Sequence, residues 1–185
     1  MNRWTRLSCF LLIVAVGTVL DLASKAVVFH YYGMPGVQDT CWLLPGVLGI
    51  QTSLNEGALF GMGQGFSAWF CAFSVLAVGF ILYWLFVAGN AKSWMWTVVL
   101  ALMTAGVIGN LYDRLGWSGL FWNYPSELHQ VGEPVHAVRD WILVMLGNYH
   151  WPNFNLADSF LVVGASWIFL MILLEKKDEP EVSDN

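Results

Sequence analysis

Residues 153–174 read NFNLADSFLVVGASWIFLMILL, so the carboxylate of Asp158 stands at the entrance of a long apolar run. The run Phe154–Leu174 is close to the twenty residues that an α-helix needs to cross a bilayer. Asn155 suits the position just before the first helical residue, where its side chain would cap the helix. Asp158 would then be the third helical residue, where the helix dipole stabilises an acid. Capping is therefore one explanation of Asp158.

Three further apolar runs precede this one, at Leu7–Phe29, Phe66–Ala88 and Trp94–Leu111. The chain is 57% hydrophobic and 11% charged, whereas soluble domains average roughly 45–50% apolar and about 25% charged residues. We therefore predict an all-α membrane protein with four transmembrane helices. The first run is longer than a signal-peptide core of about 7–15 residues, so we expect it to be a retained anchor.

The basic residues indicate the orientation of the helices. An even number of spans places both termini on one side of the membrane, and five of the eight Lys and Arg residues share that side. Positively charged residues favour the cytoplasmic side, so we expect cytoplasmic termini. We predict one integral-membrane domain over residues 1–174 and a disordered, acidic cytoplasmic tail over residues 175–185. The five basic residues are Arg3, Arg6, Lys92, Lys176 and Lys177.

Two long connections, His30–Gly65 and Tyr112–Asn153, then lie on the outer side. The first is rich in glycine and proline, and Val47–Leu54 partly alternates apolar with polar or small residues, which favours short strands on the membrane surface. The second contains Trp141–Leu146, an apolar patch too short to span and expected to lie in the interface. No basic stripe of the kind that binds nucleic acid is present in the sequence.

Charged residues inside a membrane span cost roughly 2.5–3.5 kcal/mol each, so each needs a partner or a function. Asp21 and Lys25 are four residues apart and share one face of the first helix. We favour a structural ion pair here, with a direct role near an active site as the alternative. Asn110, Asp113 and Arg114 close the third span at its outer end.

The third span also contains Gly106 and Gly109, a pair of small residues that allows close helix contact. Asp113 suits a structural polar cluster at this end of the helix. Arg114 is open to two interpretations, since its guanidinium can either join helix to loop or hold a peptide carbonyl.

Two acids, Asp140 and Asp158, can reach the same outer interface. Two carboxylates that share a site do not both ionise cheaply, so such a pair holds one proton between them. The pair can take a proton from water and give one to a leaving amine, which is the chemistry of peptide hydrolysis. We expect Asp140 to hold the proton, although pairing with its neighbour Arg139 is an alternative role.

A metal site is the other chemical possibility in the second connection. His129, Glu133 and His136 are close enough in sequence to ligate zinc, but their spacing matches no zinc motif, so solvated loop residues are favoured. The three cysteines are scattered and give neither a disulfide framework nor a CxxC pair.

Five segments together resemble the lipoprotein signal peptidases, also called signal peptidase II. They occur in the family's order and span residues 21–159. The segments are Asp21-Leu-Ala-Ser-Lys25, Asn55-Glu-Gly-Ala-Leu-Phe-Gly61, Gly109-Asn-Leu-Tyr-Asp-Arg114, Val138-Arg-Asp140 and Phe154-Asn-Leu-Ala-Asp158-Ser159.

The resemblance implies an aspartic endopeptidase of the bacterial inner membrane, with its active site at the outer face. The substrate would be a prolipoprotein, cut before its diacylglyceryl-modified cysteine, in contact with membrane lipid. The resemblance also implies a small extracytoplasmic β-cradle between the first two spans, and no metal or organic cofactor. It assigns catalysis to Asp140 and Asp158 and substrate binding to a set of motif residues, whereas Asp21, Lys25 and Asp113 keep the structural polar roles expected from their positions. The substrate-binding set is Asn55, Gly57, Asn110, Arg114, Asn155 and Ala157.

The chain departs from the family pattern between Arg114 and Asp140, where the gap is longer and includes Trp117–Pro134. Glu127 and Glu133 lie in this insertion and are alternative candidates for the first catalytic acid. We favour Asp140, because Val138-Arg-Asp-Trp-Ile142 keeps the family's context. A small proton-coupled transporter and a catalytically inactive scaffold of the same fold are the alternative functions.

Overall fold

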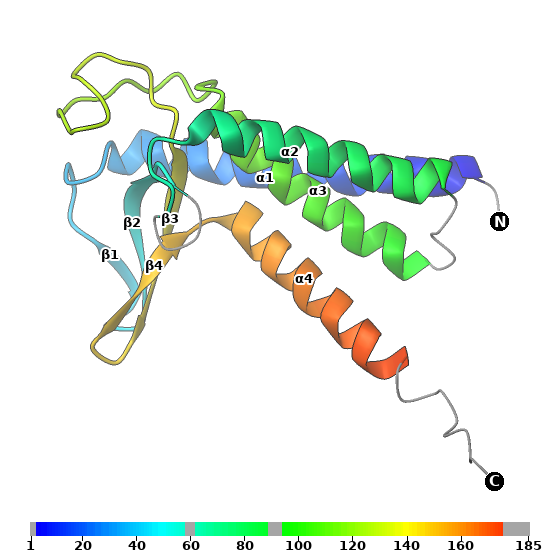
Figure 1. Ribbon diagram of the computed structural model, residues 1–185. Coiled ribbons are helices and arrows are strands. Elements are labelled where there is room, and N and C mark those ends of the chain that lie inside the picture. The colour runs from blue at the N-terminus through cyan, green and yellow to red at the C-terminus, as the bar shows by residue number, and fades with distance from the viewer. Residues whose placement is uncertain (1–2, 58–61, 89–93, 176–185) are drawn as a thin grey trace, which may run out of the picture.

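Four long helices form the body of the computed structural model, which describes residues 3–57, 62–88 and 94–175 (Figure 1). They are α1 (Arg3–Tyr32), α2 (Ser67–Leu82) continued by the π-helical turn η2 (Tyr83–Val87), α3 (Trp94–Arg114) and α4 (Leu156–Glu175). All four are long and apolar enough to cross a membrane, which confirms the predicted number of spans. The predicted acidic tail lies outside the described residues, except for Glu175.

Helix α3 is the central helix and packs against α1, α2 and α4. Half of its most apolar stretch is buried, compared with 6–22% of the corresponding stretches in the other helices. One cluster of buried side chains joins α1, α2, η2 and α3. The outward faces of the other helices are mostly apolar and exposed, as expected where lipid rather than water is the solvent. The buried cluster is Phe10, Ile81, Leu85, Leu100 and Ala101.

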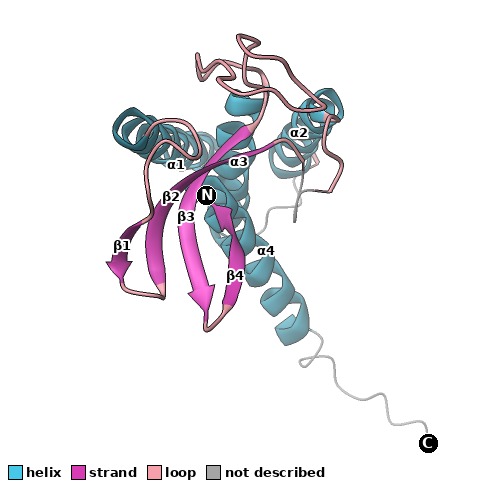
Figure 2. Cartoon of the chain, turned by 90° about the vertical axis from the view of Figure 1, so that its left-hand side faces the viewer, coloured by secondary structure: helices cyan, strands magenta, loops and turns pink. Residues whose placement is uncertain are grey.

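A four-stranded antiparallel sheet lies at the end of the helices opposite to where α1 begins and α4 ends (Figures 1 and 2). Its strands are β1 (Cys41–Leu44), β2 (Leu48–Asn55), β3 (Val138–Leu146) and β4 (Tyr149–Phe154), and each pairs with the next along the chain. The strand predicted over Val47–Leu54 is thus confirmed as β2.

The interpretation of Trp141–Leu146 as a separate interfacial segment missed its strand pairing. These residues belong to β3, an interior strand that pairs with β2 on one side and β4 on the other. The partly apolar, aliphatic-rich composition of β3 suits a strand with neighbours on both sides as well as it suits an interface. The pairing matters for function, because β4 ends at Phe154 and α4 begins at Leu156. The sheet therefore holds the entrance of the last helix.

Candidate active site

Helix α4 begins with two reciprocal hydrogen bonds between Asn155 and Asp158. The backbone N–H of Asp158 donates to Asn155 Oδ1 over 2.9 Å, and the backbone N–H of Asn155 donates to Asp158 Oδ2 over 3.2 Å. This is a capping box in which an aspartate takes the place of the more usual glutamate or glutamine. The predicted N-cap and the predicted third helical position are both confirmed.

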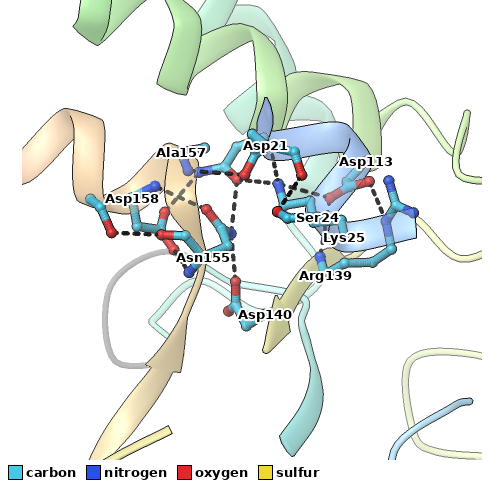
Figure 3. A network of polar contacts seen from close by, with 11 residues as sticks. Asp21, Ser24, Lys25, Asp113, Arg139, Asp140, Asn155, Ala157 and Asp158 are labelled. Atoms are coloured by element: carbon cyan, nitrogen blue, oxygen red, sulfur yellow. Dashed lines mark hydrogen bonds and ion pairs between the residues drawn. The ribbon is translucent and has the colours of Figure 1, made fainter. Parts of the chain in front are cut away.

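Asp140 reaches the same place from strand β3. The side-chain nitrogen Nδ2 of Asn155 donates to Asp140 Oδ1 over 2.7 Å, so one asparagine connects both acids (Figure 3). On the neighbouring strand, Ser53 is the direct partner of Asp140, and Asn55 lies two residues further along the same face. The side chain of Asn55 also hydrogen-bonds the Asp140 carboxyl group.

Asp140 is 2% exposed, and this burial raises the pKa of its carboxyl group well above the ordinary value of 3.8. The negative charge of Asp158 raises the pKa of Asp140 further. The hydrogen bonds from Asn155 and Asn55 and the positive charge of Lys25 act in the opposite direction, but burial is the largest effect. Asp140 therefore keeps its proton at a pH where an isolated aspartate has lost it.

Asn110 of helix α3 supports the two acids from the side of the bundle. Its Nδ2 donates to Asp158 Oδ1 over 2.8 Å, and its Oδ1 accepts from Asn155 Nδ2 over 3.1 Å. The same Oδ1 accepts from Lys25 Nζ over 3.0 Å. Both contacts come from N–H donors, so the atom of Asn110 that meets them must be the oxygen of its amide, and this fixes which way the amide is turned. Its nitrogen must then face Asp158.

Behind Asn110 lies a buried cluster of four charged side chains. Lys25 Nζ is 2.7 Å from Asp21 Oδ2 and 3.1 Å from Asp113 Oδ2, and Arg139 Nε is 2.8 Å from Asp113 Oδ1. Two cations and two anions leave no net charge, which is the condition for burying such groups. The expected ion pair between Asp21 and Lys25 is therefore present. Asp21 also accepts the backbone N–H of Ala157 over 2.9 Å, which ties the cluster to the first turn of α4.

Arg139 does not pair with Asp140, so that alternative is wrong. Successive residues of a strand point to opposite faces of the sheet, and Arg139 therefore meets Asp113 while Asp140 faces Asn155. The backbone N–H of Arg139 also donates to Asp113 over 3.2 Å. The sequence interpretation missed this role of Arg139, although the alternation of a strand over Val138–Ile142 would have indicated it.

The end of α3 and the segment after β2 meet at Arg114. Its Nη2 donates to the carbonyl oxygen of Gly57 over 3.0 Å, and the guanidinium lies 5.1 Å from the ring centre of Phe70. Gly57 in turn donates its N–H to Asn55 Oδ1 over 3.0 Å. Arg114 therefore connects helix to loop, which is one of its two predicted roles. The rest of the motif that begins at Asn55, residues 58–61, lies outside the described residues.

The acids and histidines of the insertion lie elsewhere. Glu127 and Glu133 are exposed, and Glu133 accepts a hydrogen bond from the backbone N–H of Gln130 over 3.1 Å. The ring of His129 stacks on Trp122, and His136 Nδ1 is 3.0 Å from the carbonyl oxygen of Arg114. In the described part of the chain, no three His, Cys, Asp or Glu side chains are grouped so as to hold a metal ion.

The arrangement is suited to acid–base chemistry. Two carboxyl groups come from different elements, share one asparagine and sit beside a neutral ion cluster. One of them has a raised pKa caused by burial and by the other acid. Such a pair can hold one proton and exchange it with a bound water molecule.

Comparisons with known proteins point to one family. A model of the family described as "Signal peptidase (SPase) II" matches residues 13–174. A lipoprotein signal peptidase of Rhodopirellula baltica is 43% identical over 171 residues, which cover 92% of this chain and 72% of the relative. A lipoprotein signal peptidase of Pseudomonas fluorescens is 30% identical in a match that covers 99% of this chain and 97% of the relative.

Solved structures share the fold. One, described as a bacterial membrane enzyme determined by the in meso method at 2.3 Å resolution, superposes with a TM-score of 0.73. The match covers 96% of this chain and 95% of the other, at 23% sequence identity. A second, determined at 1.9 Å resolution, gives a TM-score of 0.71 at 24% identity.

Proposed function

Because the chain belongs to the signal peptidase II family, we propose that it is an aspartic endopeptidase that removes signal peptides from prolipoproteins. The cut falls before the cysteine that carries the diacylglyceryl group. The observation that supports the aspartic mechanism is the connection of Asp140 to Asp158 through Asn155.

In the proposed reaction, the ionised carboxylate of the pair takes a proton from a bound water molecule. The water oxygen then attacks the carbonyl carbon of the scissile bond, and the protonated carboxyl group gives its proton to the carbonyl oxygen. Collapse of this intermediate breaks the C–N bond, and a proton passes to the leaving nitrogen. Asp140 is the proton holder before the attack, which its raised pKa supports. No covalent intermediate with the protein forms.

The motif residues assigned to substrate binding divide into three groups. Asn110 and Asn155 hydrogen-bond the carboxyl groups, and so they orient the acids as well as border the substrate. Asn55 contacts Asp140 from β2, and Arg114 holds the carbonyl of Gly57 beside it. Ala157 is fully buried against Gly106 and Gly109 of α3, so its small size keeps the entrance of α4 close to the bundle.

The proposed location is the bacterial inner membrane, with both termini in the cytoplasm and the acids near the outer surface. The sharing of one side by Arg3, Arg6, Lys92, Lys176 and Lys177 supports this orientation. A substrate that is anchored in the bilayer by its lipid reaches an active site at this depth without leaving the membrane. The transporter alternative is not favoured, because Asp21 and Lys25 are ion-paired within a buried cluster that has no net charge.

The test is cleavage of a diacylglyceryl-modified prolipoprotein by the purified chain in detergent. We expect Asp140→Asn and Asp158→Asn to lose cleavage while their thermal unfolding stays cooperative. Glu127→Gln, an exposed acid in the insertion, is the matched control and should cleave at the native rate. Cleavage by Asp140→Asn would refute the assignment of the pair, and a native chain that never cleaves would favour the inactive scaffold.

A further inference from the structure

The insertion between α3 and β3 is a folded unit that lies over the outer end of the bundle (Figure 1). Backbone hydrogen bonds close it on itself: Trp122 N–H donates to the carbonyl of Glu133 over 2.9 Å, and Gly132 N–H donates to the carbonyl of Trp122 over 2.8 Å. Val135 N–H donates to the carbonyl of Leu120 over 2.9 Å. Trp122 and Val135 are buried, at 4% and 0% exposed, so the insertion has a small core.

A cleft of about 570 Å³ separates this insertion from the bundle. One wall is the insertion itself, and the others are the first turns of α2, the end of α3 and Glu56. Neither Asp140 nor Asp158 lines it, so it is distinct from the acid pair. The two are adjacent, however, because Asn55 contacts Asp140 and the next residue, Glu56, lines the cleft.

His129 in the wall of the cleft has an unused hydrogen-bonding atom. Its ring lies parallel to that of Trp122, with centres 3.5 Å apart and planes inclined by 3°, and the residue is 6% exposed. Within the described residues, its Nδ1 has no hydrogen-bond partner. A buried polar atom without a partner is unfavourable, so a ligand group that reaches it and supplies a hydrogen bond would bind here favourably.

The side chains that line the cleft carry a net negative charge. Glu56 and Glu133 both line it, and the one fixed cation among the lining residues that the structure describes is Arg114. Arg114 is already engaged by the carbonyl of Gly57 and by the charge of Asp158. Its charge therefore does not neutralise the two glutamates, and a basic ligand group is favoured in the cleft.

We propose that this cleft binds the first residues of the mature chain, those that follow the modified cysteine, and prefers lysine or arginine among them. The inference rests on the proposed function. Of the three parts of the substrate that meet at the cut, the signal peptide and the acyl chains are apolar and stay in the bilayer. Only the mature chain is polar, and a cleft of this volume has room for a few of its residues.

Prolipoproteins that differ only at the second and third residues after the modified cysteine provide the test, with Lys, Ser or Glu at both positions. Two quantities are measured with the full chain in detergent at low salt: kcat/KM for cleavage, and Kd from the fluorescence anisotropy of labelled substrate. We expect the Lys substrate to exceed the Glu substrate by about tenfold in kcat/KM and in affinity. The double variant Glu56→Gln/Glu133→Gln should reduce this ratio to about one, whereas Glu127→Gln should preserve it.

A second variant tests the histidine without disturbing the stack. His129→Phe keeps an aromatic ring on Trp122 but removes Nδ1, so we expect KM and Kd to rise about threefold for all three substrates with the Lys to Glu ratio unchanged. A native ratio within twofold of one, or a ratio that survives loss of both glutamates, would overturn the inference. If the charge preference appears in Kd but no substrate is cleaved, the binding cleft stands and the proposed catalytic function fails.

Discussion

The side-chain nitrogen of Asn155 donates to Oδ1 of the Asp140 carboxyl group over 2.7 Å, while its side-chain oxygen caps the helix that carries Asp158. One residue therefore links the strand to the helix and sets the position of both acids. The two tasks of Asn155 use different atoms, Nδ2 for the strand and Oδ1 for the helix. A substitution can therefore remove one task and keep the other.

Asn155→Ser is the substitution that separates them. Both Asn155→Ser and Asn155→Ala lose the buried hydrogen bonds of Nδ2, but serine caps helices about as well as asparagine, so we expect Asn155→Ala to be less stable than Asn155→Ser by about 1 kcal/mol. Neither serine nor alanine has a side-chain nitrogen to donate to Asp140, so both variants should lose about 100-fold in kcat because Asp140 is no longer held in position. Cleavage rates and thermal unfolding are measured together. A fully active Asn155→Ser would show that the link to Asp140 is dispensable.

The raised pKa of Asp140 predicts that the free energy of unfolding depends on pH. The Asp140 carboxyl group binds its proton more tightly in the native protein than in the unfolded chain, where its pKa is near 3.8. The free energy of unfolding therefore falls as pH rises from about 4 through the higher native pKa. The total fall is about 1.4 kcal/mol for each unit by which the native pKa of Asp140 exceeds its unfolded pKa. Asp140→Asn removes this fall in stability, because asparagine has no proton to lose.

We accordingly expect Asp140→Asn to be more stable than the native chain at pH 8 and about equal to it near pH 4. Thermal unfolding in detergent at the two pH values measures the difference. Asp39→Asn, at an exposed acid, is the control and should show no such dependence. A stability difference that is the same at both pH values would mean that Asp140 is not held protonated by burial.

The raised pKa of Asp140 also predicts how cleavage depends on pH. The reaction needs one proton on the pair, so kcat/KM should fall as pH rises through the raised pKa of Asp140. It should fall again at low pH, when the pair takes up its second proton. The two inflections belong to the pair rather than to either residue. A profile that is flat across the acidic and neutral range would count against the carboxyl pair.

Much of this architecture could be predicted from residues that are adjacent in sequence. The apolar runs predict the helices, and the position of Asn155 before the last run predicts its role as N-cap with Asp158 as the third helical residue. The i,i+4 spacing of Asp21 and Lys25 predicts their ion pair, because residues four apart share one face of a helix. The use of Asp140 and Asp158 as catalytic acids stays a prediction until cleavage is measured.

The contacts that could not be predicted join residues far apart in sequence. Arg139 meets Asp113, and Asn110 meets Asp158, only because strand pairing and helix packing bring them together. Treating Trp141–Leu146 as an isolated patch hid the pairing of β3 with β2, and with it the alternation that separates Arg139 from Asp140. Register between strands is set by the whole sheet, which a single segment does not reveal.

The ion cluster should be sensitive to loss of its shared acid. Asp113 is fully buried and contacts both Lys25 and Arg139, so Asp113→Asn leaves two buried cations with one anion. We expect a loss of about 3–5 kcal/mol in the free energy of unfolding. Asp113→Asn combined with Arg139→Gln restores neutrality and should recover part of the loss. Failure of the double variant to exceed the single one in thermal stability would contradict this account.

Close packing of α3 against α4 predicts opposite outcomes for two glycine substitutions. A Cβ at Gly106 would lie 2.5 Å from the carbonyl oxygen of Ala157, and this backbone cannot yield without moving the entrance of α4. We expect Gly106→Ala to cost about 1–3 kcal/mol in stability and to reduce cleavage, because Asp158 moves with the helix. At Gly79 of α2 an added Cβ meets nothing, so Gly79→Ala should match or slightly exceed native stability, by up to about 1 kcal/mol. Thermal unfolding and cleavage of the two variants are compared side by side, and equal behaviour would mean that the α3–α4 contact does not position the acid.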